Sequence, residues 1–331
     1  MAIQQKIASS SKIVPHLWFD HEAVEATNFY ASVFPNSRVD SVAPIPADTP
    51  SGPAGSLDIV EFTLFGQRFM AINAGPYFRF NPSISFMVNF DPLFFGAPET
   101  RDKEARKKID EVWETLSDGG KVLMPLDKYP FSERYGWIED RYGLSWQLIL
   151  TNSEGEPRPP IVPSLLLTQQ NAGKAEEAID FYMSVFRNSR QGSLHRYGAG
   201  QLPDKEGTVA FADFMLQDQW FVAMDSAREH GFVFNEAISF MVNCEDQKEI
   251  DYYWEKLSAV PEAEQCGWVK DRYGVSWQIA PAVLNEMMKN ADTSRARSAT
   301  EAMLQMKKLD IAALERAFAA PTAGREKEVK S

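Results

Sequence analysis

The sequence is poor in cysteine: Cys244 and Cys266 are the only two among 331 residues. They offer neither a disulfide framework nor a Cys-x-x-Cys metal site, and such low usage is typical of a reducing compartment. Long apolar runs are also missing, since no run approaches the roughly 18 to 20 residues that a membrane-spanning helix needs. The opening residues lack the apolar core of a signal peptide. We therefore expect a cytoplasmic protein without a membrane partner.

Positive charge is scarce as well. The chain has 34 Lys and Arg against 46 Asp and Glu, which gives a net charge of -12. Such a surface repels phosphate backbones and anionic lipid, so nucleic acid is not expected as a partner. The hydrophobic share of 44% is nevertheless high enough for packed cores, and a chain of this length favours two domains.

The chain contains the same pattern twice. Three segments recur in the same order: 28–38 as 180–190, 84–89 as 238–243, and 136–148 as 267–279. Repetition in a fixed order indicates a tandem duplication. About ten residues around 119–125 have no counterpart in the second copy, so a strand and its loop are expected to be shortened or missing there.

Hydrophobic periodicity within each half predicts two β-α-β-β-β modules. In the first half we expect strands at 13–19, 38–42, 57–65, 68–73, 83–90, 121–124, 136–139 and 144–150, and helices at 22–34 and 101–117. The predicted class is α+β, with two tandem domains of paired modules. The expected boundaries are a tail at 1–11, domains at 12–150 and 161–281, a linker at 151–160 and a helical extension at 282–331.

The C-terminal extension has two helix-capping signals. Asp292 precedes a helix expected to reach Met306, and Asp310 precedes one expected to reach Phe318. We expect these helices to lie on the domain surface or on a partner subunit, either as simple packing elements or in a regulatory role.

A hairpin closes each half, with Asp-Arg-Tyr-Gly as its turn. In the second strand of the first hairpin, alternation places Trp146 and Leu148 on the core side and Ser145 and Gln147 on the other. The polar side is suited to a cavity, which makes Gln147 and its counterpart Gln278 candidate ligand-binding residues.

Paired modules, Phe-Tyr near the end of the first helix, and the ending Gly-Trp-x-x-Asp-Arg-Tyr-Gly-x-Ser-Trp-Gln resemble the vicinal oxygen chelate superfamily of glyoxalase I and the bleomycin-resistance proteins. The chain is most similar to its PhnB-like branch, also called the 3-demethylubiquinone-9 3-methyltransferase domain family, over about residues 12–150 and 161–281. The resemblance implies curved sheets around a cleft with an inward-facing metal site. Methyl transfer is not expected, because the sequence lacks the glycine-rich strand-to-helix turn typical of nucleotide pockets.

The resemblance also implies site residues. His16, fourteen positions before Tyr30, stands at a ligand position of the first strand, and Glu61 at the position of a carboxylate ligand. Gln147 replaces a glutamate on the last strand. These three would converge to hold one divalent cation in the first domain, with Glu61 as ligand or catalytic proton acceptor. Ser85 occupies the position of a second histidine, where it is a weak ligand but can contact a bound molecule.

The second half has no imidazole at these positions. The counterparts of the site residues are Ser164, Asp213, Ser239 and Gln278. We expect no metal there, and interpret the half as a structural or substrate-shaping copy in which Asp213 and Gln278 contact a ligand.

Other interpretations of these residues remain open. His16 can be a hydrogen-bonded interior residue, and Glu61 and Asp213 can be solvated. The two glutamines can donate hydrogen bonds instead of holding metal. Trp18 shares a face with His16 and either packs in the core or forms a wall for an aromatic substrate. The aromatic segment 129–135 is either a lid or a surface connection.

Two functions follow from this pattern. The first is a protein that binds a small aromatic or oxygen-rich metabolite in the first-domain cleft, with a divalent cation and weak lyase, isomerase or dioxygenase-like chemistry. The alternative is a non-catalytic binder that sequesters its ligand. We expect a monomer whose halves form an internal pseudo-dimer, or a homodimer.

Overall fold

The computed structural model describes residues 11–152 and 156–320. Residues 1–10 of the expected tail, residues 153–155 of the linker and residues 321–331 of the C-terminal extension lie outside these ranges. Within them, no helix is both long and apolar enough to cross a membrane.

The first half folds as two modules, each a strand, a helix and further strands. The first contains β1 (Ile13–Phe19), α2 (Ala23–Val33), β2 (Arg38–Pro44), β3 (Asp58–Leu64) and β4 (Gln67–Asn73). The second contains β5 (Ile84–Phe90), the short 3-10 helix η1 (Pro92–Phe94), α3 (Arg101–Ser117), β6 (Lys121–Tyr129), β7 (Ser132–Glu139) and β8 (Ser145–Leu150).

The second half repeats this order and then continues into helices. The third module contains β9 (Ile161–Leu167), η2 (Gln169–Asn171), α4 (Ala175–Val185), β10 (Arg190–Arg196), β11 (Val209–Leu216) and β12 (Gln219–Asp225). The fourth contains β13 (Ile238–Cys244), α5 (Gln247–Leu257), η3 (Pro261–Ala263), β14 (Trp268–Lys270) and β15 (Ser276–Pro281). The C-terminal helices are α6 (Val283–Met288), α7 (Thr293–Leu304) and α8 (Ile311–Ala319).

Two mixed sheets each combine modules from opposite halves of the chain. In the seven-stranded sheet, β1 of the first module pairs with β13 of the fourth, and His16 lies opposite Ser239. In the eight-stranded sheet, β5 of the second module pairs with β9 of the third, and Ser85 lies opposite Ser164. The two halves are therefore joined within the chain as an internal pseudo-dimer.

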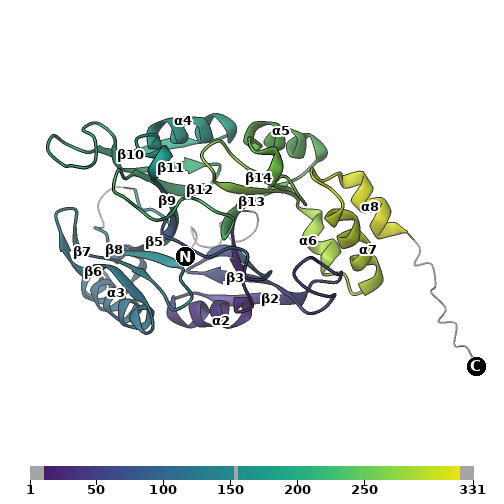
Figure 1. Cartoon of the computed structure of the whole chain (residues 1–331). Helices are drawn as coiled ribbons and strands as arrows, with labels where there is room; N and C mark the ends of the chain where they lie inside the picture. Colours follow the sequence, from purple (N-terminus) through teal and green to yellow (C-terminus); the bar gives the residue numbers. More distant parts are fainter. Residues whose placement is uncertain (1–10, 153–155, 321–331) are drawn as a thin grey trace, which may run out of the picture.

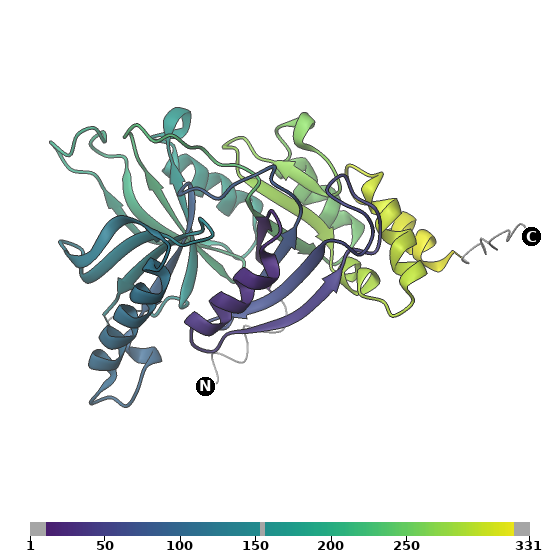
Figure 2. The ribbon, with the colours of Figure 1, turned by 60° about the horizontal axis from the view of Figure 1, so that its bottom comes forward.

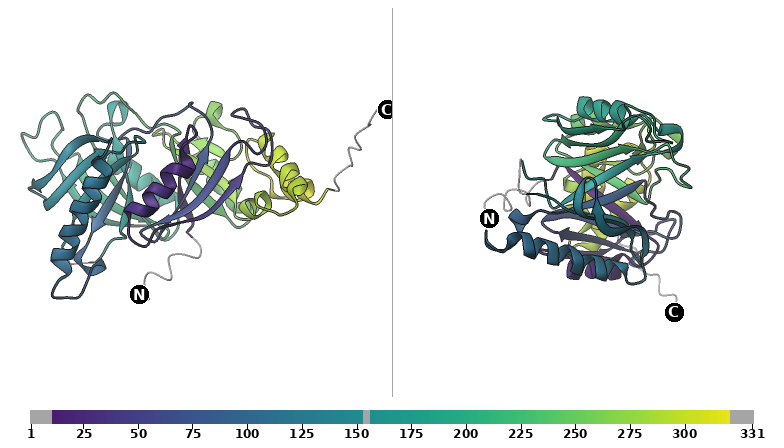
Figure 3. Two further views of the ribbon diagram at one scale, coloured as in Figure 1. Left: turned by 90° about the horizontal axis from the view of Figure 1, so that it is seen from below. Right: turned by 90° about the vertical axis from the view of Figure 1, so that its left-hand side faces the viewer.

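The helices lie on the outer sides of this arrangement. In Figure 1, α2 and α3 of the first half lie below the two sheets, and α4 and α5 of the second half lie above them. The two sheets stand side by side, and the end-on view of Figure 3 shows the same layers. The predicted α+β class with paired modules is confirmed.

Modules of the same half are held together by side chains. The rings of Tyr30 and Phe34, at the end of α2, lie 5.4 and 4.9 Å from the ring of Trp146 on β8. In the second half, Tyr182 and Phe186 lie 5.6 and 5.3 Å from Trp277. One continuous hydrophobic core therefore extends behind both sheets.

Most elements lie where the periodicity predicts them, and one agreement and two differences are informative. Among residues 156–320, the second copy has η3 in place of a strand equivalent to β6, in agreement with the expected loss of one strand. The segment 129–135 is the tip of the β6–β7 hairpin and not a separate loop, because the alternating residues extend both strands. The helix α6 was not predicted, since its six residues are too few to show a clear period.

Candidate functional site

The hairpin with the turn Asp-Arg-Tyr-Gly, which occurs once in each half, has a structural role. Gly274 takes a φ of +93° in the turn, a conformation that favours glycine. The buried carboxylate of Asp271 accepts hydrogen bonds from the backbone N–H groups of Tyr273 and Val275 at 2.9 and 3.0 Å. It also accepts from the Trp277 indole at 2.8 Å and the Tyr182 hydroxyl at 2.7 Å. The motif therefore fastens the turn to α4 of the neighbouring module.

The first half has the same arrangement around Asp140. Its carboxylate accepts hydrogen bonds from the backbone N–H groups of Tyr142 at 2.8 Å and Leu144 at 3.1 Å. It also accepts a hydrogen bond from the Trp146 indole at 2.8 Å. Burial raises the pKa of Asp140, and the hydrogen bonds from Trp146 and from the turn counteract part of this shift. Two equivalent buried aspartates thus stabilise the two hairpins.

His16 and Glu61 lie on one face of the seven-stranded sheet, but not side by side. Both residues are in register with Met70 of β4, which separates β1 from β3. Two strand spacings correspond to about 10 Å between the Cα atoms of His16 and Glu61. The counterpart positions Ser239 and Gln278 lie on the same face, where the Gln278 amide donates to the Ser239 hydroxyl at 2.9 Å.

Gln147 and Ser85 belong to the other sheet. The Gln147 amide donates to the hydroxyls of Ser85 and Ser164 at 2.7 and 3.4 Å, and its oxygen accepts from the Tyr135 hydroxyl at 2.7 Å. The expected convergence of His16, Glu61 and Gln147 is therefore corrected. Strand β1 pairs with the fourth module and not with the second, so the glutamine that shares a sheet with His16 is Gln278.

Both acidic candidates already have cationic partners. The Glu61 carboxylate forms an ion pair with Lys289, the residue after α6. Asp213 accepts from Arg158 at 2.6 Å, and the Arg158 guanidinium stacks on Trp220 at 3.9 Å. Neither carboxylate is a solvated strand residue.

His16 is neutral in the folded protein. Its side chain is 4% exposed, and burial lowers its pKa from 6.5 to about 4. Among the described residues, its Nδ1 atom has no hydrogen-bond partner, and the buried Ser276 hydroxyl on the same face has none either. His16 is thus an interior residue, as one interpretation held, but the structure describes no hydrogen bond at its Nδ1 atom.

These residues do not fit a metal site. Within residues 11–152 and 156–320, no three or more His, Cys, Asp or Glu side chains are grouped to hold an ion. Among the described strands of this sheet, His16 is the one imidazole on its face, Glu61 is neutralised by Lys289, and Gln278 is hydrogen-bonded to Ser239. A divalent cation would have to displace a lysine and break that amide contact.

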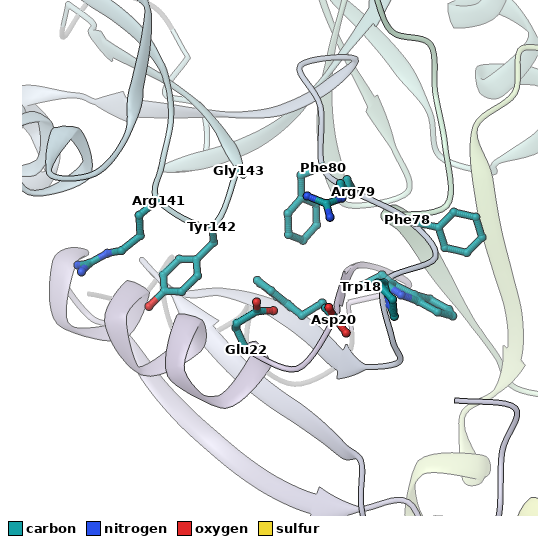
Figure 4. Close-up of a pocket in the computed structure, with 11 residues that line it drawn as sticks. Trp18, Asp20, Glu22, Phe78, Arg79, Phe80, Arg141, Tyr142 and Gly143 are labelled. Carbon is teal, nitrogen blue, oxygen red and sulfur yellow. The ribbon is translucent and has the colours of Figure 1, made fainter. Parts of the chain in front are cut away.

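A cavity of about 380 Å³ opens where the end of β1 meets the β7–β8 turn and the segment that joins β4 to β5. Figure 4 shows aromatic side chains around it and charged groups from opposite sides. Its volume lies in the range of small-molecule sites, about 300–1,000 Å³. Its lining includes the aromatic residues Trp18, Phe78, Phe80 and Tyr142 and the charged residues Asp20, Glu22, Arg79 and Arg141.

The aromatic walls are fixed by their contacts. The Trp18 indole donates to the backbone oxygen of Gly75 at 2.8 Å, and its ring meets Phe78 edge-on at 5.1 Å. The Tyr142 hydroxyl donates to Glu25 at 2.8 Å, and burial together with Glu25 raises the pKa of Tyr142 to about 12. Tyr142 therefore remains a neutral phenol. Trp18 lines the cavity, and its role as a wall for a bound ligand stays a prediction.

The two arginines that line the cavity differ in their contacts. The Arg141 guanidinium stacks on Phe29 at 4.0 Å and in Figure 4 points away from the cavity. Arg79 lies above the cavity, and Asp20 and Glu22 lie below it. Within the described part of the chain, the Arg79 guanidinium has no hydrogen-bond or ion-pair partner. Arg79 is thus available to an anionic group.

Sequence periodicity missed Phe78, Arg79 and Phe80. They lie in an irregular segment between β4 and β5, where neither strand nor helix spacing applies. Their one available signal was the run Tyr77-Phe78-Arg79-Phe80, an unusual aromatic density for a polar connection.

Comparison with protein families agrees with this architecture. The family model described as 3-demethylubiquinone-9 3-methyltransferase matches residues 11–149 and 159–280, one match in each half. No curated protein matches the chain.

Solved structures show similarity to one half or to both. A PhnB protein from Bacillus cereus is 36% identical and covers 43% of this chain and 100% of its own, with a TM-score of 0.35. Glyoxalase I from Zea mays is 10% identical. It covers 88% of this chain and 100% of its own, with a TM-score of 0.46. A glyoxalase family protein from Bacillus cereus is 14% identical. It covers 41% of this chain and 89% of its own, with a TM-score of 0.27.

Proposed function

The chain belongs to the 3-demethylubiquinone-9 3-methyltransferase family, and on this premise we propose that it binds a small aromatic metabolite with an anionic group. The ligand occupies the cavity beside Trp18. The observation that carries this proposal is an aromatic-walled cavity of about 380 Å³ with an unpaired guanidinium, that of Arg79, among the described residues. Methyl transfer is not part of the proposal, because the chain lacks a glycine-rich nucleotide-binding turn.

The cavity favours a flat ring with one acidic group. Trp18 and Phe80 offer faces and edges against which an aromatic ring packs. Arg79 supplies a planar donor group suited to a carboxylate or phosphate. Asp20 and Glu22 on the other side repel a second negative charge and can accept hydrogen bonds from hydroxyl or amino groups. We therefore favour monoanionic aromatic ligands over dianionic ones.

Binding is tested with matched pairs of aromatic acids and their neutral amides. We expect the acids to bind and to quench tryptophan fluorescence, while the amides bind about 10- to 100-fold more weakly. A hydrogen bond to a charged group contributes about 1.5–3 kcal/mol, which corresponds to this range. Fluorescence titration and the ligand-induced rise in the unfolding temperature measure the effect.

Variants separate this site from other surfaces. Arg79→Ala should abolish the preference for acid over amide, and Trp18→Ala should weaken both ligands. Arg187→Ala is the matched control, because Arg187 is an exposed arginine at the end of α4, away from the cavity. Equal affinity of the wild type and both cavity variants for every acid would overturn the proposal.

The alternative is metal-assisted lyase, isomerase or dioxygenase-like chemistry at His16 and Glu61. We favour the non-catalytic binder, because Glu61 is paired with Lys289 and the expected ligands lie in two sheets. The expected result is therefore that 1 mM Mn²⁺, Zn²⁺ or Ni²⁺ moves the unfolding temperature by less than about 1 °C. A ligand at 100 times its Kd would add about 2.7 kcal/mol of stability. A rise of several degrees that disappears in His16→Gln would support the metal alternative instead.

A further inference from the structure

The connection between the first strand and the first helix differs in length between the two halves. In the first half, the three residues 20–22 join β1 to α2, whereas in the second half the seven residues 168–174 join β9 to α4. The strands before these connections end at equivalent residues, Phe19 and Leu167, which pair with the ends of β4 and β12. The second half therefore has additional residues at this place, and they contain η2.

The additional residues bind the two segments whose counterparts line the cavity of the first half. The Thr168 hydroxyl donates to the carbonyl oxygen of Phe232 at 3.0 Å, and the Asn171 amide donates to that of Tyr273 at 2.6 Å. Tyr273 belongs to the hairpin turn. Phe232 belongs to the β12–β13 connection, which crosses between the sheets as the β4–β5 connection does (Figure 2). In the first half, the equivalent turn and connection line the cavity beside Trp18.

The two hairpin turns have the same anchor but different surroundings. The hydroxyls of Tyr142 and Tyr273 each donate to a glutamate of α2 or α4, at 2.8 and 2.9 Å. A Cβ atom on Gly274 would lie 3.8 Å from the Cβ atom of Phe234, whereas one on Gly143 would meet no described atom within 4 Å. The second half thus fills with its own chain the space that the first half leaves open.

The two connections between the sheets are equivalent residue by residue. The Asn235 amide donates to the carbonyl oxygen of Arg79 at 2.8 Å, and the Asn81 amide donates to that of Val233 at 3.1 Å. This exchange places Val233 at the position of Arg79. The filled half therefore has an apolar residue where the open half has a guanidinium without a partner in the described chain.

Two carbonyl oxygens of the first half lack the donors that their counterparts have. Phe78 and Tyr142 are the counterparts of Phe232 and Tyr273, and both line the cavity. Within residues 11–152 and 156–320, no group donates a hydrogen bond to either oxygen. A ligand in the cavity can therefore take the place of the Asn171 amide by donating a hydrogen bond to Tyr142.

The cavity has opposite charges on opposite sides. Arg79 lies on one side, and Asp20 and Glu22 lie on the other (Figure 4). Among the described residues, the ion-pair contacts of both carboxylates are to the exposed His21 between them, at 3.5 and 3.7 Å. The acidic side is therefore suited to a positively charged donor, because a charged hydrogen bond is stronger than a neutral one.

We propose that the ligand of this cavity carries a protonated amino group at the end opposite its acidic group. The ammonium group lies at the hairpin turn, where it donates to the Tyr142 carbonyl oxygen and is attracted by Asp20 and Glu22. The acidic group lies at Arg79, and an aromatic ring beside Trp18 separates the two charges. This inference rests on the function proposed above, and it narrows the ligand from aromatic acids to aromatic acids with an amino group at the far end.

Binding to the full-length chain is tested with para-(aminomethyl)benzoate and para-ethylbenzoate. The two compounds have nearly the same shape, and only the first carries an ammonium group at neutral pH. We expect it to bind about tenfold more tightly in calorimetric titrations, because a hydrogen bond to a charged group outweighs the burial of one methyl group. Phenylalanine, whose two charges share one carbon, should gain less than about twofold over hydrocinnamate.

Charge variants assign the preference to the acidic side of the cavity. Asp20→Asn combined with Glu22→Gln should remove the preference for the ammonium compound without weakening the binding of para-ethylbenzoate. The matched control is Asp218→Asn combined with Glu206→Gln, which removes the same two charges from exposed positions of the second half. This control should keep the tenfold preference.

A chimera tests the equivalence of the filled and the open space. Residues 168–174 replace residues 20–22, so that the cavity receives the segment that fills its counterpart. We expect the affinity for both compounds to fall by at least about 100-fold. Circular dichroism verifies that the chimera is folded, and the double variant Asp20→Asn with Glu22→Gln decides the question if it is not.

The outcomes separate this inference from the proposed function. Equal affinity of the wild type for the two benzoates, or a preference that persists in the double variant, would overturn the inference and leave the proposed function in place. Undiminished binding to the folded chimera would overturn both, because the ligand would then lie elsewhere. Failure of every aromatic acid to bind would also overturn both.

Discussion

Asp271→Ala is expected to lower the free energy of unfolding by about 3–5 kcal/mol. The substitution leaves four buried donors without an acceptor, namely two backbone N–H groups, the Trp277 indole and the Tyr182 hydroxyl. Each unsatisfied buried group costs about 1–3 kcal/mol. Part of the loss is offset, because burial raises the pKa of Asp271 and removing the carboxylate removes its desolvation cost. Urea titration followed by tryptophan fluorescence measures the difference.

The matched control is Asp218→Ala. Asp218 is exposed in the turn between β11 and β12, so its removal should change stability by no more than about 0.5 kcal/mol. Asp271→Asn should be intermediate, since one amide oxygen can still accept from the turn. If Asp271→Ala unfolds at the urea concentration of the wild type, the hairpin motif does not stabilise the contact between modules.

The buried His16 should make the protein less stable in mild acid, by about 3 kcal/mol at pH 4 relative to pH 7. Its pKa is 6.5 in an ordinary environment and about 4 when folded, so the unfolded chain binds the proton more readily. The stability is complete above pH 6.5 and is lost as the pH falls toward 4. The gap between a pKa of 6.5 in the unfolded chain and about 4 in the folded one corresponds to about 3 kcal/mol, because a tenfold change in an equilibrium is about 1.36 kcal/mol.

The contribution of His16 is isolated by comparing variants across pH 4 to 7. His16→Gln should remove this part of the pH dependence, because glutamine does not titrate in this range. His195→Gln should retain it, since His195 is exposed on β10. Equal slopes of unfolding free energy against pH in the wild type and His16→Gln would contradict the prediction.

Local structure was well predicted from the sequence, because local residues determine it. The periodicity gives β1 and α3 with their observed ends. Asp292 and Asp310 cap α7 and α8 as expected, since an acceptor before a helix satisfies its free N–H groups. Alternation also placed Trp146 in the core.

Which strand pairs with β1 could not be predicted from local periodicity. Ser85 and Ser239 stand at equivalent places in two nearly identical segments, Ile84–Phe90 and Ile238–Cys244, so His16 has two chemically similar neighbours to pair with. The structure selects Ser239, and this choice separates His16 from Gln147. Local periodicity contains no information that distinguishes these pairings.

The candidate site was predicted only in part. Trp18 was singled out because it alternates with His16, and it forms a wall of the cavity. Arg79 and Phe80 come from an irregular connection whose path depends on how the first and second modules pack. Lys289 could not be assigned to Glu61, because 228 residues separate them along the chain (289 − 61).

The crossed pairing of the two sheets makes the duplicated halves mutually dependent. A first half on its own would present the edges of β1 and β5 without β13 and β9, and unpaired edges associate with any strand that can complete them. Two copies of one half could satisfy each other, which is how an ancestral homodimer becomes a single polypeptide by gene fusion. In the duplicated chain both edges are paired within one polypeptide, so a half expressed alone is expected to self-associate and the whole chain is not required to.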